Sequence, residues 1–379
     1  MTVYLDNAAT TPVAPEVVEA MIPVLKEGFG NPSSTHSYGR KTKALIETSR
    51  RSIAKHLNCR PSEIIFTSGG TEADNMALTS AVVHCGVTHI ITSQIEHKAV
   101  ICASDALKEQ HGVKVSYVKL DENGAVNLED LERLLEEDGK AIVSLMHANN
   151  EIATLLPLEI VSKLCKKHGA YFHSDTVQTM GHYAFDLNEL EIDFLTCAAH
   201  KFHGPKGIGF LYVNNNAKAQ ALIHGGAQER GMRGGTENVY GIVGLAKAMD
   251  LAYEDVEEHQ TYVQGLKDHM IAELKAMFTD INFHGEIRPE KSLYTVLNVC
   301  FPKTEKAGML LFTLDIKGIA VSGGSACSSG ASVGSHVLTG IDADMTRPNV
   351  RFSFSRYTTM EEIEFALEQI RVVFEKTLV

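Results

Sequence analysis

The sequence predicts an α/β fold, with a large domain built on a mainly parallel mixed sheet and a smaller α+β domain at the C-terminal end. Two observations carry this prediction. Short β-rich runs alternate with amphipathic helical patterns through the first two-thirds of the chain, which is typical of a parallel sheet covered by helices. A long helical pattern from Leu245 to Leu274 then leads into a region with its own strands and a final helix.

The elements follow in order along the chain. Seven strands are expected in the large domain, at Ile64–Phe66, His89–Thr92, Val113–Lys119, Ile142–Leu145, Tyr171–Ser174, Phe194–Cys197 and Gly209–Tyr212. The small domain is expected to contain strands near Thr295–Val299 and Val350–Phe354 and a helix from Glu361 to about Phe374. We expect residues 14–255 to form the large domain, and residues 1–13 with 256–379 to form the small one.

Composition excludes several classes of protein. The 379 residues have a net charge of −12, which argues against direct binding of nucleic acid. No apolar run reaches the roughly 20 residues that span a bilayer, and the first residues do not resemble a signal peptide, so we expect a cytoplasmic protein without membrane contact. The seven cysteines are odd in number and lack CxxC spacing, which argues against a disulfide framework or a structural zinc site.

Polar motifs follow several of the expected strands. After Ile64–Phe66 come two glycines and a helix start at Gly70 and Thr71, a place where free backbone N–H groups and the helix dipole suit a phosphate. A plain capped helix start explains the same residues. In α/β sheets, ligands collect beyond the carboxyl ends of the strands, so these motifs are expected to share one site.

Three further motifs indicate which ligand this site would take. His200 and Lys201 directly follow an apolar strand, and a lysine in such a setting can react with carbonyl compounds; Lys206 is the competing candidate. Asp175 ends another strand and could pair with a protonated ring nitrogen, or cap the next helix. His97 could lay its ring against a planar cofactor. Together these residues suit pyridoxal 5′-phosphate.

Cys327 lies in a stretch dominated by serine and glycine, from Ser322 to Ser335. Such a composition buries little apolar surface and predicts an exposed, mobile loop. Because cysteine is usually a buried small hydrophobe, a cysteine in this loop is interpreted as a thiol that moves.

Motifs along nearly the whole chain resemble those of the NifS/IscS-type cysteine desulfurases, in the class V aminotransferase group of fold-type I pyridoxal-phosphate enzymes. The matching segments are Tyr4–Thr11, Gly30–His36, Thr67–Glu72, Glu96–Val100, His147–Glu151, His200–Lys201, Arg230–Thr236, Ser325–Cys327 and Arg351–Arg356. The resemblance implies removal of sulfur from L-cysteine, giving L-alanine and a persulfide on Cys327. The sulfur would pass to an acceptor, such as an iron–sulfur scaffold protein or a thiolation pathway.

The resemblance also implies a role for each residue. Lys201 would form the Schiff base and move the α proton, and His97 would stack on the ring. Asp175 would face the pyridine nitrogen, and Gln178 the phenolic oxygen. The remaining implied contacts are Gly70, Thr71 and His200 to the phosphate, Thr236 to the phosphate of a partner subunit in a homodimer, and Asn150 and Arg356 to the substrate carboxylate.

Two departures and two alternatives accompany the resemblance. Ala198 stands where relatives often have a serine, so one phosphate hydrogen bond would be missing or supplied elsewhere. The run after the Cys327 loop, Ser332–Leu338, also differs, which leaves the sulfur acceptor open. The resemblance implies no metal in the resting enzyme, although Cys327 could transiently ligate a nascent iron–sulfur cluster. A selenocysteine lyase and another class V aminotransferase-type enzyme are the alternative functions.

Overall fold

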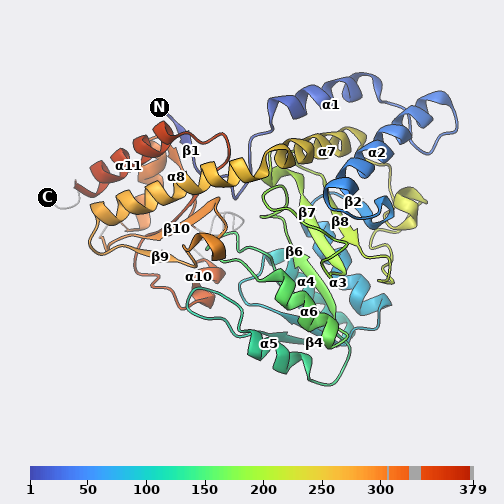
Figure 1. Cartoon of the computed structure of the whole chain (residues 1–379), viewed down its shortest axis with the longest axis horizontal. Coiled ribbons are helices and arrows are strands. Elements are labelled where there is room, and N and C mark those ends of the chain that lie inside the picture. Colours follow the sequence, from blue (N-terminus) through green and yellow to red (C-terminus); the bar gives the residue numbers. More distant parts are fainter. Residues whose placement is uncertain (305–306, 324–333, 376–379) are drawn as a thin grey trace.

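A computed structural model describes residues 1–304, 307–323 and 334–375 of the chain (Figure 1). Seven strands form its main sheet, in the order β2-β8-β7-β6-β5-β3-β4. Their bounds are β2 Ile64–Thr67, β3 His89–Thr92, β4 Lys114–Tyr117, β5 Ala141–Ser144, β6 Tyr171–Asp175, β7 Phe194–Ala198 and β8 Gly209–Val213. Strands β4, β3, β5, β6 and β7 run parallel to one another, and β8 pairs antiparallel with both β7 and β2. The predicted mainly parallel mixed sheet is therefore confirmed.

Six of the seven strands of the main sheet are buried on both faces, and the edge strand β4 is partly exposed. Ile90 and Ile142 belong to the hydrophobic cluster beneath α3 and α4, whereas Ile91 and Val143 belong to the cluster on the other face. The covering helices are α1 Pro15–Glu27, α2 Ser37–His56, α3 Gly70–Thr79, α4 Lys98–His111, α5 Leu128–Leu135, α6 Leu158–Lys167 and α7 Val239–Glu254.

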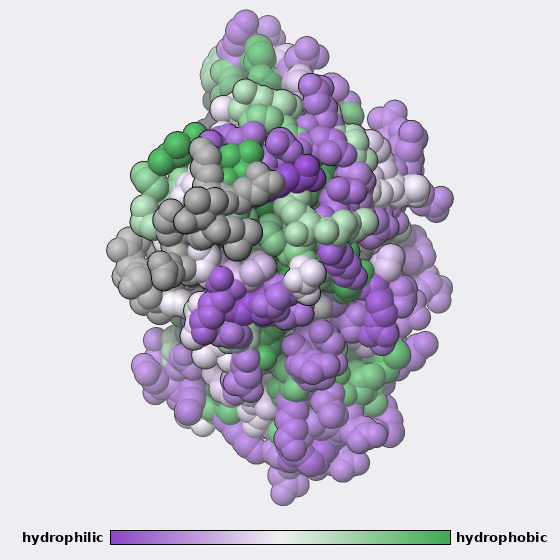
Figure 2. Space-filling view, turned by 90° about the vertical axis from the view of Figure 1, so that its left-hand side faces the viewer, coloured by the Kyte–Doolittle hydropathy of each residue, from purple (hydrophilic) through white to green (hydrophobic). Residues whose placement is uncertain are grey.

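The C-terminal part has a separate three-stranded antiparallel sheet, in the order β12-β10-β9. Its elements are α8 Val256–Met277, β9 Asn282–His284, β10 Val296–Cys300, α9 Leu310–Ile316, α10 His336–Gly340, β12 Asn349–Ser353 and α11 Met360–Glu375. The N-terminal strand β1, Val3–Tyr4, pairs in parallel with β11, Ile319–Ala320. Residues from both ends of the chain thus share one hydrophobic cluster, which includes Val3, Leu5 and Phe352. The outer face of this part is largely hydrophilic, with smaller hydrophobic groups between (Figure 2).

The prediction of one continuous helix over Leu245–Leu274 is wrong, because two helices cover this range. The chain leaves helical geometry at Asp255, with φ −138° and ψ 48°, so α7 ends at Glu254 and α8 begins at Val256. Helix α7 packs against the main sheet, and α8 packs in the C-terminal part (Figure 1). The division into domains at residues 13 and 255 stays a prediction. None of the described helices is long and apolar enough to cross a bilayer.

Candidate active site

A cavity of about 350 Å³ opens at the carboxyl ends of β5, β6 and β7. This is the edge of a parallel sheet at which ligands bind in α/β folds. Its lining combines residues that follow five strands of the main sheet with residues from the two ends of the chain. They are Ala8, Ala9, Gly70, Thr71, Asp74, His97, Lys98, Met146, Ala148, Asn150, Glu151, Asp175, Val177, Gln178, Ala198, His200, Lys201, His336 and Arg351.

Lys201 lies at the end of a 3₁₀ turn, Ala199–Lys201, that directly follows β7. Its Nζ donates hydrogen bonds to the backbone carbonyls of Ala8, at 2.6 Å, and Ala9, at 2.9 Å. The turn is fixed to the N-terminal segment, because the backbone N–H of Thr11 donates to the carbonyl of His200 at 2.9 Å. The amine is therefore held in the cavity by the first residues of the chain.

Asp175 ends β6, where its buried carboxylate accepts a hydrogen bond from the backbone N–H of Val177 at 2.9 Å. Burial raises the pKa of Asp175, and the negative charge of Asp74 raises it further. Both carboxylates are almost completely buried; Oδ1 of Asp74 accepts no hydrogen bond from the described residues and lies 3.4 Å from Nε2 of His173. A cationic group beside Asp175 would therefore be strongly favoured.

The start of α3 supplies the backbone groups expected for an anion site. Gly70 is the first residue of the helix, and a Cβ atom there would lie 2.8 Å from Cγ2 of Val177. Only glycine fits this close approach without a shift of Val177. Thr71 follows, and Asp74 lies one helical turn further on the same face, which explains why it also lines the cavity.

Two histidines of the cavity are held by hydrogen bonds to neighbouring groups. Nδ1 of His97 accepts from the backbone N–H of Ala99 at 3.2 Å, so His97 caps α4. Nδ1 of His200 lies 3.1 Å from the Thr10 hydroxyl. Burial, followed by the charge of Lys201, lowers the pKa of His200 to about 4, so its ring is neutral at physiological pH.

Glu96 is buried directly behind His97. Its carboxyl group accepts hydrogen bonds from the Ser93 hydroxyl and from the backbone N–H of Met146, each at 2.9 Å. Burial raises the pKa of Glu96 to about 8, so the group is largely protonated at neutral pH and ties the start of α4 to the segment after β5.

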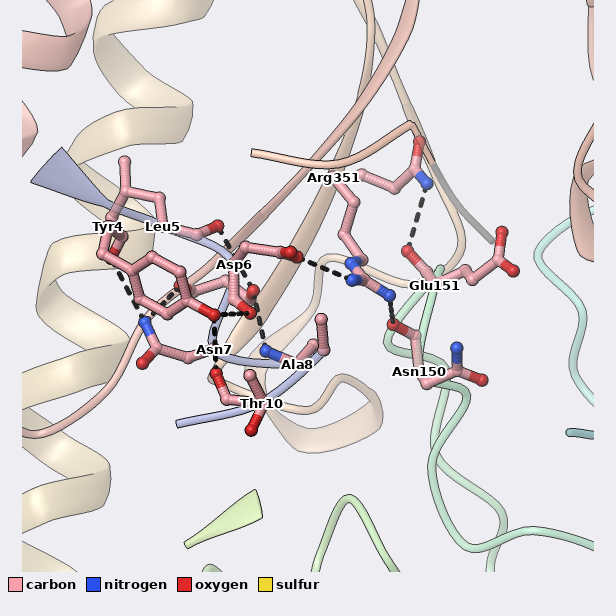
Figure 3. Close-up of polar contacts among 12 residues, drawn as sticks. Tyr4, Leu5, Asp6, Asn7, Ala8, Thr10, Asn150, Glu151 and Arg351 are labelled. Atoms are coloured by element: carbon pink, nitrogen blue, oxygen red, sulfur yellow. Dashed lines mark hydrogen bonds and ion pairs between the residues drawn. The ribbon is translucent and has the colours of Figure 1, made fainter. Parts of the chain in front are cut away.

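The arginine that reaches the cavity is Arg351, in the middle of β12 (Figure 3). Its guanidinium donates to Oδ1 of Asp6 at 2.8 Å and to the backbone carbonyl of Asn150 at 2.9 Å. Nε of Arg351 has no hydrogen-bond partner among the described residues. A guanidinium carries five N–H donors, and one that keeps donors beyond these two bonds is suited to a carboxylate ligand.

Arg356 does not reach this cavity, contrary to the sequence prediction. Its guanidinium donates to the carbonyl of Leu251 at 2.8 Å and to the Tyr357 hydroxyl at 3.1 Å, and it lines a separate small cavity with His182. Arg356 lies beyond the end of β12, where the regular alternation of the strand no longer directs its side chain. The predicted contact of Arg356 with substrate is therefore withdrawn in favour of Arg351.

The other predicted residues divide into three groups. Gly70, Thr71, Asn150, Gln178 and Ala198 line the cavity together with His97, Asp175, His200 and Lys201. Thr236 lines a different cavity, of about 240 Å³, beside Ser68 and Arg233. Cys327 lies outside the described residues.

Five cavity residues with ionisable side chains were not predicted as site residues from the sequence, namely Asp74, Lys98, Glu151, His336 and Arg351. A signal existed for Arg351, because it alternates with Val350 and Phe352, which both face the hydrophobic core. A charged residue at the opposite face of such a strand needs a polar partner. Asp74 could have been found from its spacing of four residues after Gly70.

Comparisons with known proteins identify the family. The sequence model described as aminotransferase class-V matches residues 3–365. The chain is 43% identical over 378 residues to a protein of Dictyoglomus turgidum named cysteine desulfurase IscS, covering 99% of this chain and 95% of that protein. The chain belongs to the cysteine desulfurases of the aminotransferase class-V family. Members of this family are dependent on pyridoxal phosphate.

Further relatives are similar to this chain over nearly its full length. A Bacillus subtilis protein named putative cysteine desulfurase IscS 1 is 40% identical, with 99% of both chains covered. Among solved structures, one titled NifS-like protein has a TM-score of 0.91 and 39% identity, covering 99% of this chain and all of the other. Another, titled SspA in complex with cysteine, has a TM-score of 0.81 and 32% identity, covering 94% of this chain and all of the other.

Proposed function

We propose that this enzyme uses pyridoxal phosphate to convert L-cysteine to L-alanine and a persulfide on Cys327. The observation that carries the proposal is the meeting of the Lys201 amine, the buried Asp175 carboxylate and the start of α3 in one cavity. This combination offers an amine, a partner for a ring cation and a phosphate cradle. In this family it favours desulfuration of an amino acid.

The residues present fit the cofactor. The buried carboxylate of Asp175 would pair with a protonated pyridine nitrogen. Gly70 and Thr71 line the cavity at the N-terminus of α3, where free backbone N–H groups suit a phosphate. Lys201 would carry the cofactor, His97 would lie over its ring, and Gln178 would face its phenolic oxygen. The cofactor supplies an electron sink for the substrate carbon skeleton.

The chain's own residues would orient the substrate and move its protons. Arg351 would bind the carboxylate of L-cysteine through its unused Nε–H, with Asn150 alongside. The Lys201 amine would take the α proton, since it is held beside the Ala8 and Ala9 carbonyls within the cavity. The Cys327 thiolate would bond to the substrate sulfur as that sulfur leaves its carbon, which then takes a proton to give alanine.

A homodimer is part of the proposal. Helix α1 exposes an apolar stripe at helical spacing: Val18 is 43% exposed, Ile22 40% and Leu25 57%, and Phe29, just after the helix, is 75% exposed. Such a stripe on a polar protein suits an interface with a second copy of the chain. Thr236, which faces away from the cavity of its own chain, would then reach the phosphate of the partner.

We also propose a cytoplasmic location and transfer of the sulfur to an acceptor protein, including iron–sulfur scaffolds. All six cysteines that the structure describes are unpaired thiols, which suits a reducing compartment.

The decisive experiment is mass analysis of the pyridoxal-phosphate-loaded enzyme after addition of L-cysteine. We expect one added sulfur atom on the peptide that contains Cys327, and one alanine per sulfur released. Cys327→Ser should abolish turnover but keep the absorbance of the bound cofactor. Cys102→Ser is the matched control, because Cys102 is an exposed thiol on α4, and it should keep full activity. Full turnover by Cys327→Ser would contradict the proposal.

A further inference from the structure

His336 is a second imidazole on the wall of the active-site cavity. It is the first residue of α10, and it follows the segment that contains Cys327 along the chain. None of the roles considered so far involves this side chain, so its position requires an explanation.

The backbone around His336 is held firmly. The Ser335 hydroxyl caps α10 by accepting from the backbone N–H of Leu338 at 3.0 Å, and it donates to the buried carboxylate of Glu151. Val337 and Leu338 are completely buried in a small hydrophobic cluster with Ile95. These contacts on both sides fix the start of α10, and with it His336, against the cavity.

The hydrogen bond of His336 defines which ring nitrogen carries the proton. Nε2 lies 2.9 Å from the backbone carbonyl of Glu96. A carbonyl oxygen only accepts, so Nε2 must be the N–H donor, and the lone pair of the neutral ring is on Nδ1. Nδ1 makes no hydrogen bond with any residue that the structure describes.

His97 presents the opposite arrangement. Its Nδ1 is the acceptor for the Ala99 N–H, so in the neutral ring the proton is on Nε2. Both rings line the same cavity, and the carbonyl that holds His336 belongs to Glu96, the residue bonded to His97. The cavity thus contains one histidine with a fixed N–H and one with an available lone pair.

Titratable groups from three elements lie around His336. Glu96 and His97 precede α4, Glu151 follows β5, and Arg351 comes from β12. Glu151 lies on the far side of Ser335, whose hydroxyl donates to its carboxyl group. L-cysteine has three polar groups. The proposed function assigns its carboxylate to Arg351 and places its amine beside Lys201. The thiol is the group that remains for His336.

We propose that Nδ1 of His336 accepts the thiol proton of bound L-cysteine, which makes His336 a second catalytic base of the reaction. The inference rests on the proposed desulfurase function. As the sulfur leaves its carbon, the S–H bond breaks and an N–H bond forms. The electron pair of the S–H bond stays on sulfur, and the imidazolium returns the proton to solvent after the products leave.

His336→Gln is the matched test variant. The glutamine amide can still donate to the Glu96 carbonyl, but it has no basic nitrogen in place of Nδ1. With L-cysteine at pH 7 we expect kcat/KM to fall by about 100-fold, the scale of general-base catalysis. The deficit should shrink toward roughly pH 9, where the thiol, with an ordinary pKa of about 8.5, ionises by itself.

L-selenocysteine separates proton transfer from a structural role. Its selenol is already ionised at neutral pH, so it offers no proton, and His336→Gln should turn it over as fast as the wild type does. His111→Gln, at the exposed end of α4, should leave both substrates unaffected. An equal loss for both substrates at every pH, or no loss with L-cysteine, would overturn the proposal.

A measurement on the unmodified enzyme tests the proposal even if the variant does not fold. The profile of kcat/KM against pH should show an acidic limb for L-cysteine, caused by protonation of the base, that is absent for L-selenocysteine. Identical profiles would count against the role of His336. Failure of the wild type to release alanine from either substrate would instead reject the desulfurase function itself.

Discussion

Replacing Arg351 by lysine tests whether Arg351, rather than the Arg356 expected from the sequence, binds the substrate carboxylate. The guanidinium uses one donor to Asp6 and one to Asn150, and its Nε–H is among the donors left for a substrate carboxylate. Lysine keeps the positive charge and can still pair with Asp6. It lacks the planar fork that bonds to Asp6, Asn150 and a ligand at the same time.

The loss expected from Arg351→Lys is one charge-assisted hydrogen bond to substrate. Such bonds contribute about 1.5–3 kcal/mol, which corresponds to roughly a 10- to 150-fold decrease in affinity. Because the carboxylate is bound in the same way before and during reaction, the change should appear mainly in KM, with kcat nearly unchanged. Alanine release measured over a range of L-cysteine concentrations gives both constants.

Two further variants complete this experiment. Arg356→Lys should leave KM unchanged, since Arg356 bonds to Leu251 and Tyr357 outside the cavity. Asp6→Asn removes the ionic partner of Arg351 without touching the ligand side, and it should raise KM less than Arg351→Lys does. A raised KM in Arg356→Lys together with an unchanged KM in Arg351→Lys would refute the reasoning.

Two other predictions concern stability. Glu229 forms a buried pair with Arg50, at 2.7 and 2.8 Å, and Glu229→Gln should lower the free energy of unfolding in urea by about 3–5 kcal/mol; a loss below 1 kcal/mol would contradict this. Lys267 is fully buried, which lowers its pKa to about 7. Between pH 7 and about 10 the unfolded chain binds the extra proton, so the stability of the wild type relative to Lys267→Met should rise with pH by about 1.4 kcal/mol per unit. Parallel stability curves for the two proteins would contradict it.

The sheet could be predicted from the sequence because each strand is a short apolar run bounded by turns. All seven predicted strands of the large domain are present, with ends displaced by at most two residues. The motif residues Lys201, Asp175 and His97 could be grouped because the carboxyl ends of neighbouring parallel strands meet at one edge. The local sequence pattern and the topology of the sheet are therefore sufficient to predict this part of the site.

The site residues contributed by the C-terminal part could not be predicted in the same way. Arg351 and Arg356 lie five residues apart in one motif, and only the register of β12 against β10 decides which faces the cavity. Asp255 breaks a continuous helical pattern because α7 and α8 pack on different cores, a tertiary effect that periodicity does not encode. His336 depends on a hydrogen bond to a backbone carbonyl more than two hundred residues away.

The attachment of Lys201 to the first residues of the chain has a consequence for biosynthesis. Ala8 and Ala9 leave the ribosome first, but they hold the lysine only after the turn at Ala199–Lys201 has been made. The same segment is fixed by Ser353, whose hydroxyl accepts from the backbone N–H of Ala8 at 2.9 Å. Contacts of such long sequence separation form late in folding. The reactive amine is thus assembled in its working position only when nearly the whole polypeptide has been synthesised.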